Sequence, residues 1–204
     1  MVLVAKGAEA NLSLEGGVLV KERIGKKYRI KEIDGRLRKT RTQREAKLLE
    51  NALRAGVCVP KVLKVDLSAC KIYMEYLDGL SMKDYLEKAE GKEIDEIAHS
   101  IGESVSRLHD VNIVHNDLTT SNMLVKDGRV YFIDFGLGGT STRAEDKAMD
   151  LVVLKKSIGV SHTEIAKHFW HKIIEAYTPK KMHSEILNRV AVIEKRVRYA
   201  EQGI

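Results

Sequence analysis

The sequence predicts a two-lobed α+β fold in which a strand-rich first part precedes a mainly helical second part. Short apolar runs of strand type occupy the first third of the 204 residues, and one helical stretch interrupts them. Apolar residues at helical spacing dominate from about residue 80 onwards. Such segregation indicates an α+β layout, and a cleft between the two parts is the expected ligand site.

The first part contains four predicted strands and one helix. The strands are Asn11–Leu14, Val18–Arg23, Lys61–Leu67 and Lys71–Tyr76. Glu15-Gly16-Gly17 supplies the turn between the first two strands. From Thr40 the pattern becomes helical, and it stops at Gly56 and Pro60. The apolar residues that define this helix are Ala46, Leu48, Leu49, Ala52 and Leu53.

The second part is mostly helical. Ser81 and Asp84 resemble a cap for a short helix that ends near Glu90. A longer helix follows, with an apolar stripe made of Ile94, Ile97, Ala98, Ile101, Val105 and Leu108. Asp127-Gly128 predicts a hairpin that joins Met123–Val125 to Val130–Ile133. From Ala144 the periodicity is helical nearly to the end, with expected breaks around Gly159 and Pro179.

The composition is that of an ordinary globular chain. Apolar residues make up 44% and charged residues 31% of the sequence, which argues against disorder. The longest apolar stretches, such as Val18-Leu19-Val20, are too short to span a bilayer, and no secretion signal is visible. Cys58 and Cys70 form no metal or redox spacing. We therefore expect a cytoplasmic protein with reduced thiols and no membrane contact.

Positive charge gathers in one segment. Between Lys21 and Lys47 there are twelve Lys or Arg and four Asp or Glu, a local net charge of +8 against +6 for the whole chain. A second basic group closes the chain: Lys195, Arg196 and Arg198. The first segment is either a solvated face or a surface that meets nucleic acid or an acidic partner, and the sequence leaves both interpretations open.

The strongest chemical signal is a polar segment, His115–Asn122, followed by Asp134-Phe135-Gly136. Phosphoryl transfer needs Mg²⁺ held on the phosphates and an oriented nucleophile, and Mg²⁺ favours hard oxygen ligands. The two motifs lie at opposite ends of a short predicted hairpin, which returns Asn122 and Asp134 to the same place with Asp117 nearby. Gly136 permits the backbone to turn after Asp134. The pattern therefore predicts a phosphate and metal site.

The two motifs resemble the catalytic loop of protein kinases, His-x-Asp-x-x-x-x-Asn, with the metal-binding Asp-Phe-Gly after it. By this resemblance Asp117 would orient the attacking hydroxyl or water, and His115 would be structural. Asn122 and Asp134 would be the metal ligands. The resemblance implies an ATP phosphotransferase or ATPase that uses ATP and Mg²⁺, with Asp117, Lys21, Asn122 and Asp134 as its catalytic residues.

The strand-rich part supplies candidates for the remaining kinase roles. Lys21 resembles the strand lysine that grips ATP phosphates, and Glu45 resembles its carboxylate partner. Lys21 could instead be an edge-strand lysine that faces water, and Glu45 could instead complete a capping box with Thr42. Two more segments would contact the nucleotide. Lys6-Gly7-Ala8-Glu9-Ala10 takes the place of the glycine-rich loop with one glycine, and the backbone of Glu75 and Leu77 would bind adenine as a hinge.

Departures from the kinase pattern narrow the subfamily. Asn116 replaces the usual arginine of the His-Arg-Asp motif, and Thr119 stands where serine/threonine kinases usually carry a lysine beside the transferred phosphate. Losing that lysine weakens transition-state stabilisation for ordinary protein substrates. No Ala-Pro-Glu motif follows Gly136, and only 68 residues remain after it. We therefore do not expect the large helical subdomain that docks peptides in ordinary kinases to be present in full.

With these departures, the chain resembles the small atypical serine/threonine kinase of the KEOPS complex. This complex is the archaeal and eukaryal assembly that helps make threonylcarbamoyladenosine on tRNA. The most specific matching segment is Asp117-Leu118-Thr119-Thr120-Ser121-Asn122. The other matching segments are Lys6–Ala10, Lys21–Ile24 with Tyr28-Arg29, Arg41–Ala46, Gly56–Pro60 and Glu145–Leu151. The tail, Arg196-Val197-Arg198-Tyr199, departs from the family's commoner Arg-x-Arg-Gly-Arg.

The resemblance implies a reduced two-lobed kinase-like domain over 1–204, with an N-lobe (1–76), a hinge (77–79) and a C-lobe (80–204). It implies an ATPase that supports tRNA modification, with weak serine/threonine autophosphorylation when the protein is alone. Its partners would be the threonylcarbamoyl-transferring subunit, a small regulatory subunit and tRNA. Asp150 would anchor the catalytic loop from the next helix.

Two other functions stay open at this stage. One is a free serine/threonine protein kinase similar to the RIO group, or a small-molecule phosphotransferase. The other is a nucleotide-sensing adaptor in which ATP only orders the two lobes. Two local alternatives also remain. His168 and His171 are spaced to share a metal but lack a third ligand nearby, and Thr140, Ser141 and Thr142 are either phosphate acceptors or a polar loop.

Overall fold

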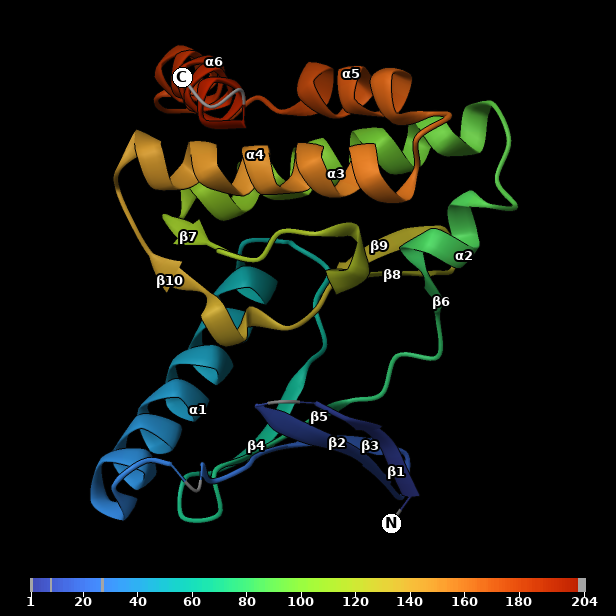
Figure 1. Ribbon diagram of the computed structural model, residues 1–204. Helices are drawn as coiled ribbons and strands as arrows, with labels where there is room; N and C mark the ends of the chain where they lie inside the picture. The colour runs from blue at the N-terminus through green and yellow to red at the C-terminus, as the bar shows by residue number, and fades with distance from the viewer. Residues whose placement is uncertain (1, 8, 27, 202–204) are drawn as a thin grey trace.

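The computed structural model describes the backbone of residues 2–7, 9–26 and 28–201, and their side chains as far as Arg196. It has an N-lobe of strands with one long helix and a C-lobe of helices with short strands (Figure 1). This arrangement confirms the predicted α+β class. The N-lobe elements are β1 (Val2–Lys6), β2 (Ala10–Glu15), β3 (Val18–Arg23), α1 (Lys31–Arg54), β4 (Val62–Asp66) and β5 (Lys71–Glu75).

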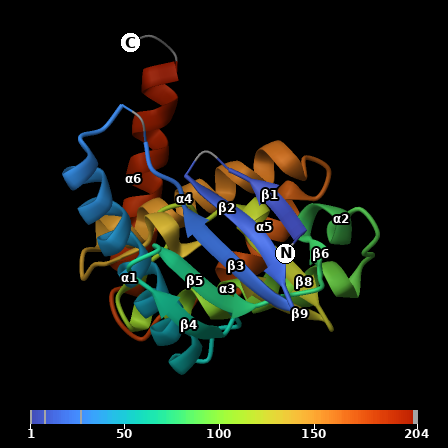
Figure 2. The ribbon, with the colours of Figure 1, turned by 90° about the horizontal axis from the view of Figure 1, so that it is seen from below.

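The N-lobe sheet is antiparallel and has the strand order β1-β2-β3-β5-β4 (Figure 2). The predicted hairpin joins β2 to β3, and its Gly16 and Gly17 both have positive φ, which glycine adopts without steric cost. Because β3 lies in the middle of the sheet, its side chains are covered by neighbours on both sides. Strand β1 was not predicted from the sequence. Its described residues are exposed, so no burial pattern marks them.

Helix α1 begins at Lys31, well before the predicted start at Thr40. The prediction was wrong because the first half of α1 buries almost no apolar surface: Ile33 and Leu37 are exposed, so no apolar stripe marks it. Thr42 therefore lies inside the helix, where its hydroxyl donates to the Arg38 carbonyl at 2.8 Å. The capping-box interpretation of Glu45 is wrong for the same reason.

The C-lobe follows the predicted helical pattern with local corrections. Its helices are α2 (Met82–Leu86), α3 (Lys92–Asp110), α4 (Ala144–Ser161), α5 (Ala166–Ala176) and α6 (His183–Glu201), with the 3-10 turns η1 (Thr120–Asn122) and η2 (Phe135–Leu137). Its strands are β6 (Leu80–Ser81), β7 (Ile113–Val114), β8 (Met123–Lys126), β9 (Arg129–Phe132) and β10 (Gly139–Thr140). The Asp127-Gly128 hairpin and the break near Pro179 are confirmed.

One predicted helix boundary in the C-lobe was wrong. The short helix stops at Leu86 instead of Glu90, because residues 87–90 add only Ala89 as an apolar side chain. Helix α4 ends at Ser161, two residues after Gly159, so the predicted break around Gly159 is confirmed. Gly159 itself still lies in the helix, because a single glycine costs a helix only about 1 kcal/mol and Ile158 beside it is buried. No helix in the described part of the chain is long and apolar enough to cross a membrane.

One apolar core spans both lobes. Leu48 and Leu49 of α1 belong to the same buried cluster as Phe135 of η2 and Leu151 of α4. Helix α1 contacts the η2 turn as well as β4 and β5. This shared core fixes α1 against the C-lobe, and it therefore fixes the charged side chains that α1 carries between the lobes.

Helices α3 and α5 approach each other closely at Gly102. A Cβ atom at this position would lie 2.3 Å from the Ile173 carbonyl oxygen and 2.8 Å from Ala176 Cβ. By contrast, a Cβ at Gly159 of α4 would meet nothing within 4 Å. Gly102 and Gly159 therefore have the same low helix propensity, but only Gly102 is closely packed.

This contrast gives a paired prediction. Gly102→Ala should lower the free energy of unfolding by about 1–3 kcal/mol, because overpacking outweighs the gain in helix propensity. Gly159→Ala should raise it by about 0.5–1 kcal/mol. Urea unfolding followed by circular dichroism measures both. Equal changes in the two variants would contradict the close approach of α3 and α5.

Candidate active site

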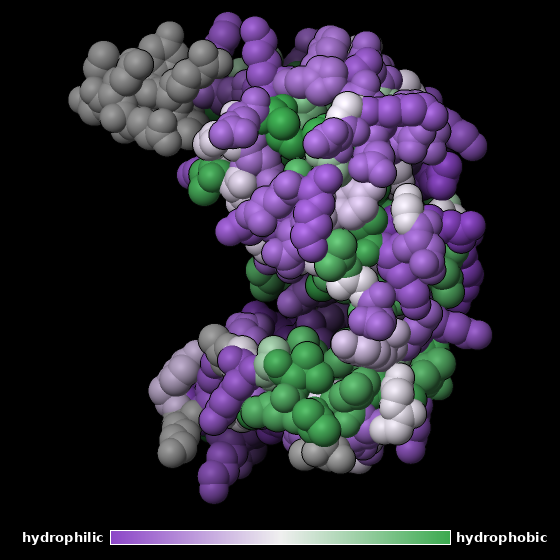
Figure 3. All heavy atoms as spheres, turned by 90° about the vertical axis from the view of Figure 1, so that its right-hand side faces the viewer, coloured by the Kyte–Doolittle hydropathy of each residue, from purple (hydrophilic) through white to green (hydrophobic). Residues whose placement is uncertain are grey.

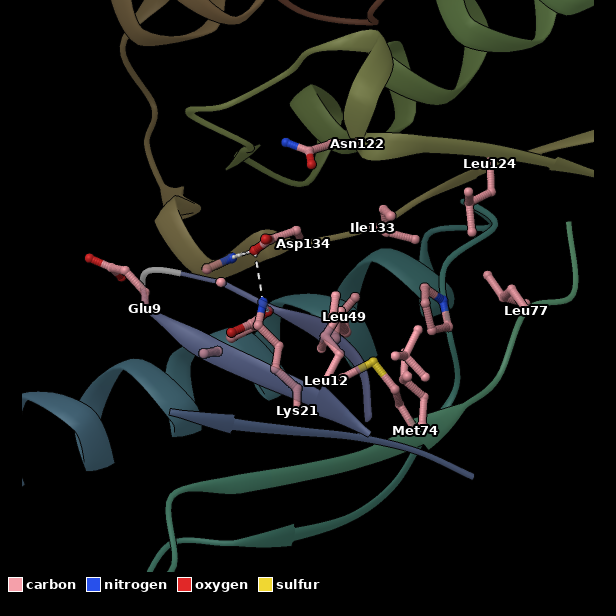
Figure 4. Close-up of a pocket in the computed structure, with 18 of the residues that line it drawn as sticks. Glu9, Leu12, Lys21, Leu49, Met74, Leu77, Asn122, Leu124, Ile133 and Asp134 are labelled. Atoms are coloured by element: carbon pink, nitrogen blue, oxygen red, sulfur yellow. Dashed lines mark hydrogen bonds and ion pairs between the residues drawn. The ribbon is translucent and has the colours of Figure 1, made fainter. Parts of the chain in front are cut away.

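A cavity of about 700 Å³ lies between the lobes (Figure 4). The space-filling view shows the outline of the molecule notched between the C-lobe above and the N-lobe below (Figure 3). The cavity brings together most of the predicted site residues from distant parts of the chain. Those that line it are Gly7, Glu9, Ala10, Lys21, Glu45, Glu75, Leu77, Asp117, Asn122 and Asp134. Ala8 lies outside the described residues, and Lys6 is exposed on β1 and does not line the cavity.

Lys21 joins the two lobes through two carboxylates. Its Nζ lies 2.6 Å from Glu45 Oε1 on α1 and 2.8 Å from Asp134 Oδ1 of the C-lobe (Figure 4 shows the second contact). Lys21 is only 8% exposed, because β3 is an inner strand of the sheet. The alternative of an edge-strand lysine that faces water is therefore wrong.

Glu45 binds a second cation that the sequence analysis did not single out. Its Oε2 accepts a short hydrogen bond from Arg23 Nη2, while Oε1 binds Lys21. Glu45 is 1% exposed and Arg23 is 5% exposed. Residues two apart on a strand point to the same face, so β3 presents Lys21 and Arg23 together to Glu45. That spacing is the signal that could have identified Arg23.

The charges shift the titration of the residues they surround. Burial by itself lowers the pKa of Lys21, but the nearby carboxylates of Glu45 and Asp134 outweigh it, so the pKa lies above its ordinary value. Partial burial raises the pKa of Asp134, but the Lys21 ammonium and the Gly136 amide outweigh it, so the pKa lies below its ordinary value. Lys21 is therefore charged, and Asp134 is ionised, at neutral pH.

Asp134 lies in a tight turn that is stabilised by its contact with Gly136. Its φ of 59° is left-handed, and its Oδ1 accepts a hydrogen bond from the Gly136 amide at 3.1 Å. A Cβ at Gly136 would lie 2.9 Å from Asp134 Oδ1 and 3.1 Å from Arg23 Nη2. Glycine at 136 is therefore needed for the close approach of the carboxylate and the guanidinium. The Asp134 side chain remains 52% exposed, so its oxygens are open to the cavity.

Asp117 and Asn122 hold each other at the opposite wall of the cavity. Asn122 Nδ2 donates to both Asp117 Oδ2 and the Asp117 carbonyl oxygen at 2.9 Å. These bonds orient the amide of Asn122 and leave its Oδ1 as the atom for a ligand. The carboxylate of Asp134 and the Oδ1 of Asn122 are hard oxygen donors, which fits Mg²⁺.

A buried carboxylate supports the loop that carries Asp117. Asp150 of α4 accepts hydrogen bonds from the backbone amides of His115 and Asn116, each at 2.7 Å. Asn116 has a positive φ of 60° and donates its Nδ2 to the Leu137 carbonyl at 3.0 Å. Asparagine tolerates this left-handed conformation better than most residues. His115 is buried against Phe135 and binds the Ile133 carbonyl, so it is structural.

The other half of the cavity is apolar. Its lining residues include Leu12, Leu19, Leu49, Pro60, Met74, Leu77, Leu124 and Ile133. The predicted hinge needs one refinement, because the Glu75 amide already donates to the Lys61 carbonyl at 2.9 Å. Only the carbonyl of Glu75 is therefore a candidate acceptor for an adenine amine, while Leu77 lies beside it on the cavity wall.

The remaining sequence alternatives resolve into local contacts. His168 binds Asp95 at 2.5 Å, and His171 lies 3.5 Å from Glu175, so each histidine has its own carboxylate. Ser141 donates to Asp146 at 2.7 Å, and a phosphate there would face that carboxylate.

The basic segment between Lys21 and Lys47 divides into a buried and an exposed part. Lys21 and Arg23 are buried in the site, whereas residues such as Lys31, Arg36 and Lys39 of α1 are exposed.

Comparisons with known proteins identify relatives of this chain. A sequence model of the lipopolysaccharide kinase (Kdo/WaaP) family matches residues 19–177. The KEOPS complex subunit Bud32 of Pyrococcus abyssi is 39% identical, over 100% of this chain and 98% of that one. A probable bifunctional tRNA threonylcarbamoyladenosine biosynthesis protein of Methanobrevibacter smithii is also 39% identical, over 97% of this chain. This chain spans only 36% of that bifunctional relative.

Solved structures show the same fold at low sequence identity. The complex of the Rio2 kinase of Chaetomium thermophilum with ADP, Mg²⁺ and phosphoaspartate superposes with a TM-score of 0.65 at 13% identity. The match covers 98% of this chain and 70% of that one, and it shows a kinase-like fold. Identity of 39% along nearly the whole of both chains shows closer kinship: the chain belongs to the family of the KEOPS complex subunit Bud32, and it also matches the family model of the lipopolysaccharide kinases (Kdo/WaaP).

Proposed function

We propose that this chain is an atypical kinase that binds and hydrolyses Mg-ATP within a KEOPS-type complex and so supports threonylcarbamoyladenosine formation on tRNA. One observation carries the proposal: Lys21, held by buried Glu45, faces Asp134 in a cavity that also contains Asp117 and Asn122. Kinship with Bud32 and with the bifunctional relative supports the tRNA context. The proposed place of action is the cytoplasm.

Each part of the cavity has a proposed role in the reaction. The apolar half would hold adenine, with the Glu75 carbonyl and the Leu77 backbone at its edge. Asn122 and Asp134 would hold Mg²⁺, which neutralises charge on the phosphates when bound. Asp117, kept in place by Asn122, would accept a hydrogen bond from the attacking hydroxyl or water and so aim its oxygen at the terminal phosphate.

Lys21 would change partners when nucleotide binds. In the structure its ammonium bridges Glu45 and Asp134. Phosphate oxygens compete with Asp134 for the ammonium, while Glu45 keeps the lysine aimed at the cavity because Arg23 fixes the other carboxylate oxygen. This exchange would leave the carboxylate of Asp134 available to hold Mg²⁺. The Lys21–Glu45 contact would therefore persist while Asp134 is replaced by a phosphate oxygen.

The C-lobe favours ATP hydrolysis over phosphorylation of peptides. Thr119 supplies no cation for a transferred phosphate. We propose that 1–76, 77–79 and 80–204 act as N-lobe, hinge and C-lobe of one domain. The threonylcarbamoyl-transferring subunit, a small regulatory subunit and tRNA would be its partners, and autophosphorylation by the isolated chain would be weak.

Two substitutions test the catalytic roles separately. Asp117→Ala should lower the rate of phosphate release by about 10²–10⁴-fold while Mg-ATP still binds, because Asp117 only orients the nucleophile. Asp134→Ala should weaken Mg-ATP binding itself. Phosphate release and isothermal titration with Mg-ATP measure these effects, with the exposed Glu96→Ala on α3 as a control.

The partner dependence provides a further arm of the same experiment. Phosphate release should rise when the threonylcarbamoyl-transferring subunit and tRNA are added. An Asp117→Ala protein that hydrolyses ATP as fast as the parent would overturn the catalytic assignment. Strong labelling of an unrelated protein without partners would favour a free protein kinase, and an Asp134→Ala protein that fully restores tRNA modification would favour an adaptor.

A third substitution tests the charge cluster that aims Lys21. Glu45→Gln removes the carboxylate shared by two buried cations, so we expect the free energy of unfolding to fall by about 3 kcal/mol. Glu50→Gln, on the exposed face of the same helix, should change it by less than about 0.5 kcal/mol. Urea unfolding at neutral pH compares the two. Equal stabilities of Glu45→Gln and the parent would show that Glu45 does not hold both cations.

A further inference from the structure

The loop between β1 and β2 carries a carboxylate that the proposed reaction does not use. Glu9 lines the cavity, but its side chain extends away from Lys21 at the far end of the site (Figure 4). Its Oε2 lies 2.7 Å from Arg41 Nη1 of α1 and 3.7 Å from Arg23 Nη1 of β3. A carboxylate turned into the cavity would repel phosphate groups, whereas here two cations hold it outward.

The backbone of the same loop is fixed at both ends. The Gly7 amide donates to the Ala10 carbonyl at 3.0 Å, and a Cβ at Gly7 would lie 2.9 Å from that oxygen, so the turn requires glycine. The Ile24 amide donates to the Glu9 carbonyl at 3.2 Å, which ties the loop to the end of β3. The Glu9 side chain adds a third contact to these two hydrogen bonds, and this third contact joins the loop to α1.

The contacts of Glu9 continue into the centre of the site. Arg41 precedes Glu45 by one helical turn, so both project from the same face of α1. Arg23 binds Glu45 through Nη2 and approaches Glu9 through Nη1. The loop, α1 and β3 therefore share one network of charges that ends at Lys21 and Asp134.

We propose that Glu9 is a positioning residue: it straps the β1–β2 loop to α1 and thereby holds the loop over the phosphates of a bound nucleoside triphosphate. Kinase loops rich in glycine reach the phosphates through backbone amides, and this loop has one glycine. The ion pair between Glu9 and Arg41 restrains the loop through a side chain, and this restraint sets the position of the backbone amides. The proposal rests on the proposed nucleotide-binding function.

The strap and simple electrostatics predict opposite patterns. If Glu9 and Arg41 acted on phosphates only through their charges, Glu9→Gln would tighten nucleotide binding and Arg41→Gln would weaken it, and the two effects would add. If the pair acts as a strap, either substitution releases the loop. Both variants then weaken binding, and the double variant binds no more weakly than the weaker single variant.

The first measurement uses the protein without nucleotide. Amide hydrogen exchange in the peptide that spans the β1–β2 loop should be roughly two- to fivefold faster in Glu9→Gln and in Arg41→Gln, the range expected for an exposed ion pair. Glu50→Gln is the matched control, because Glu50 is as exposed as Glu9, at 47%, and pairs with Arg54 on the same helix. Exchange at the parent rate in either strap variant would overturn the proposal.

The second measurement is a double-mutant cycle on Mg-ATP affinity by isothermal titration. We expect each single variant to bind Mg-ATP roughly two- to fivefold more weakly than the parent, with the double variant equal to the single variants. Opposite changes in the two single variants would overturn the strap while leaving the nucleotide site intact. A parent that does not bind Mg-ATP would refute the proposed function, whereas the exchange result would still decide whether Glu9 restrains the loop.

Discussion

The geometry of the candidate active site depends on one buried carboxylate between two cations. Glu45 receives Lys21 on one oxygen and Arg23 on the other, and all three side chains are almost fully buried. Charges removed from water in this way are tolerated only when each is paired, so α1 and β3 must sit in register for the N-lobe to be stable. The pairing therefore specifies geometry, whatever its net contribution to stability. Through Lys21 the same register reaches Asp134 and the C-lobe.

Apolar packing and a second buried carboxylate complete the frame around this cluster. Leu48 and Leu49 of α1 share a core with Phe135, which stands directly after Asp134. Asp150 holds the backbone of His115 and Asn116, and so positions the loop that presents Asp117. Both walls of the cavity are thus fixed by contacts to buried acidic groups. The exposed carboxylate of Asp134 lies between the two walls, where it is accessible to a cation and a phosphate.

Local signals in the sequence predicted the parts of this frame that local rules determine. The Asp127-Gly128 hairpin brought Asn122 and Asp134 to one cavity, as its turn chemistry requires. The start of α1 was missed because exposed residues such as Ile33 and Leu37 show no periodic burial. Arg23 and Glu9 were not recognised as partners of Glu45 and Arg41, because these contacts join segments that only the folded chain brings together. The spacing of these residues on β3 and α1 shows which side chains share a face of the strand or helix. It does not show which residues of other segments that face contacts.

The most direct test of the account is a crystal structure with Mn²⁺ and a non-hydrolysable ATP analogue, in which anomalous scattering locates the metal. We predict a manganese peak bound by Asn122 and Asp134, with Lys21 moved from Asp134 to a phosphate oxygen and still paired with Glu45. Mn²⁺ suits this test because it accepts the same oxygen ligands as Mg²⁺. A nucleotide bound elsewhere, or a Lys21 that remains on Asp134 while the phosphates lie outside the cavity, would contradict the account.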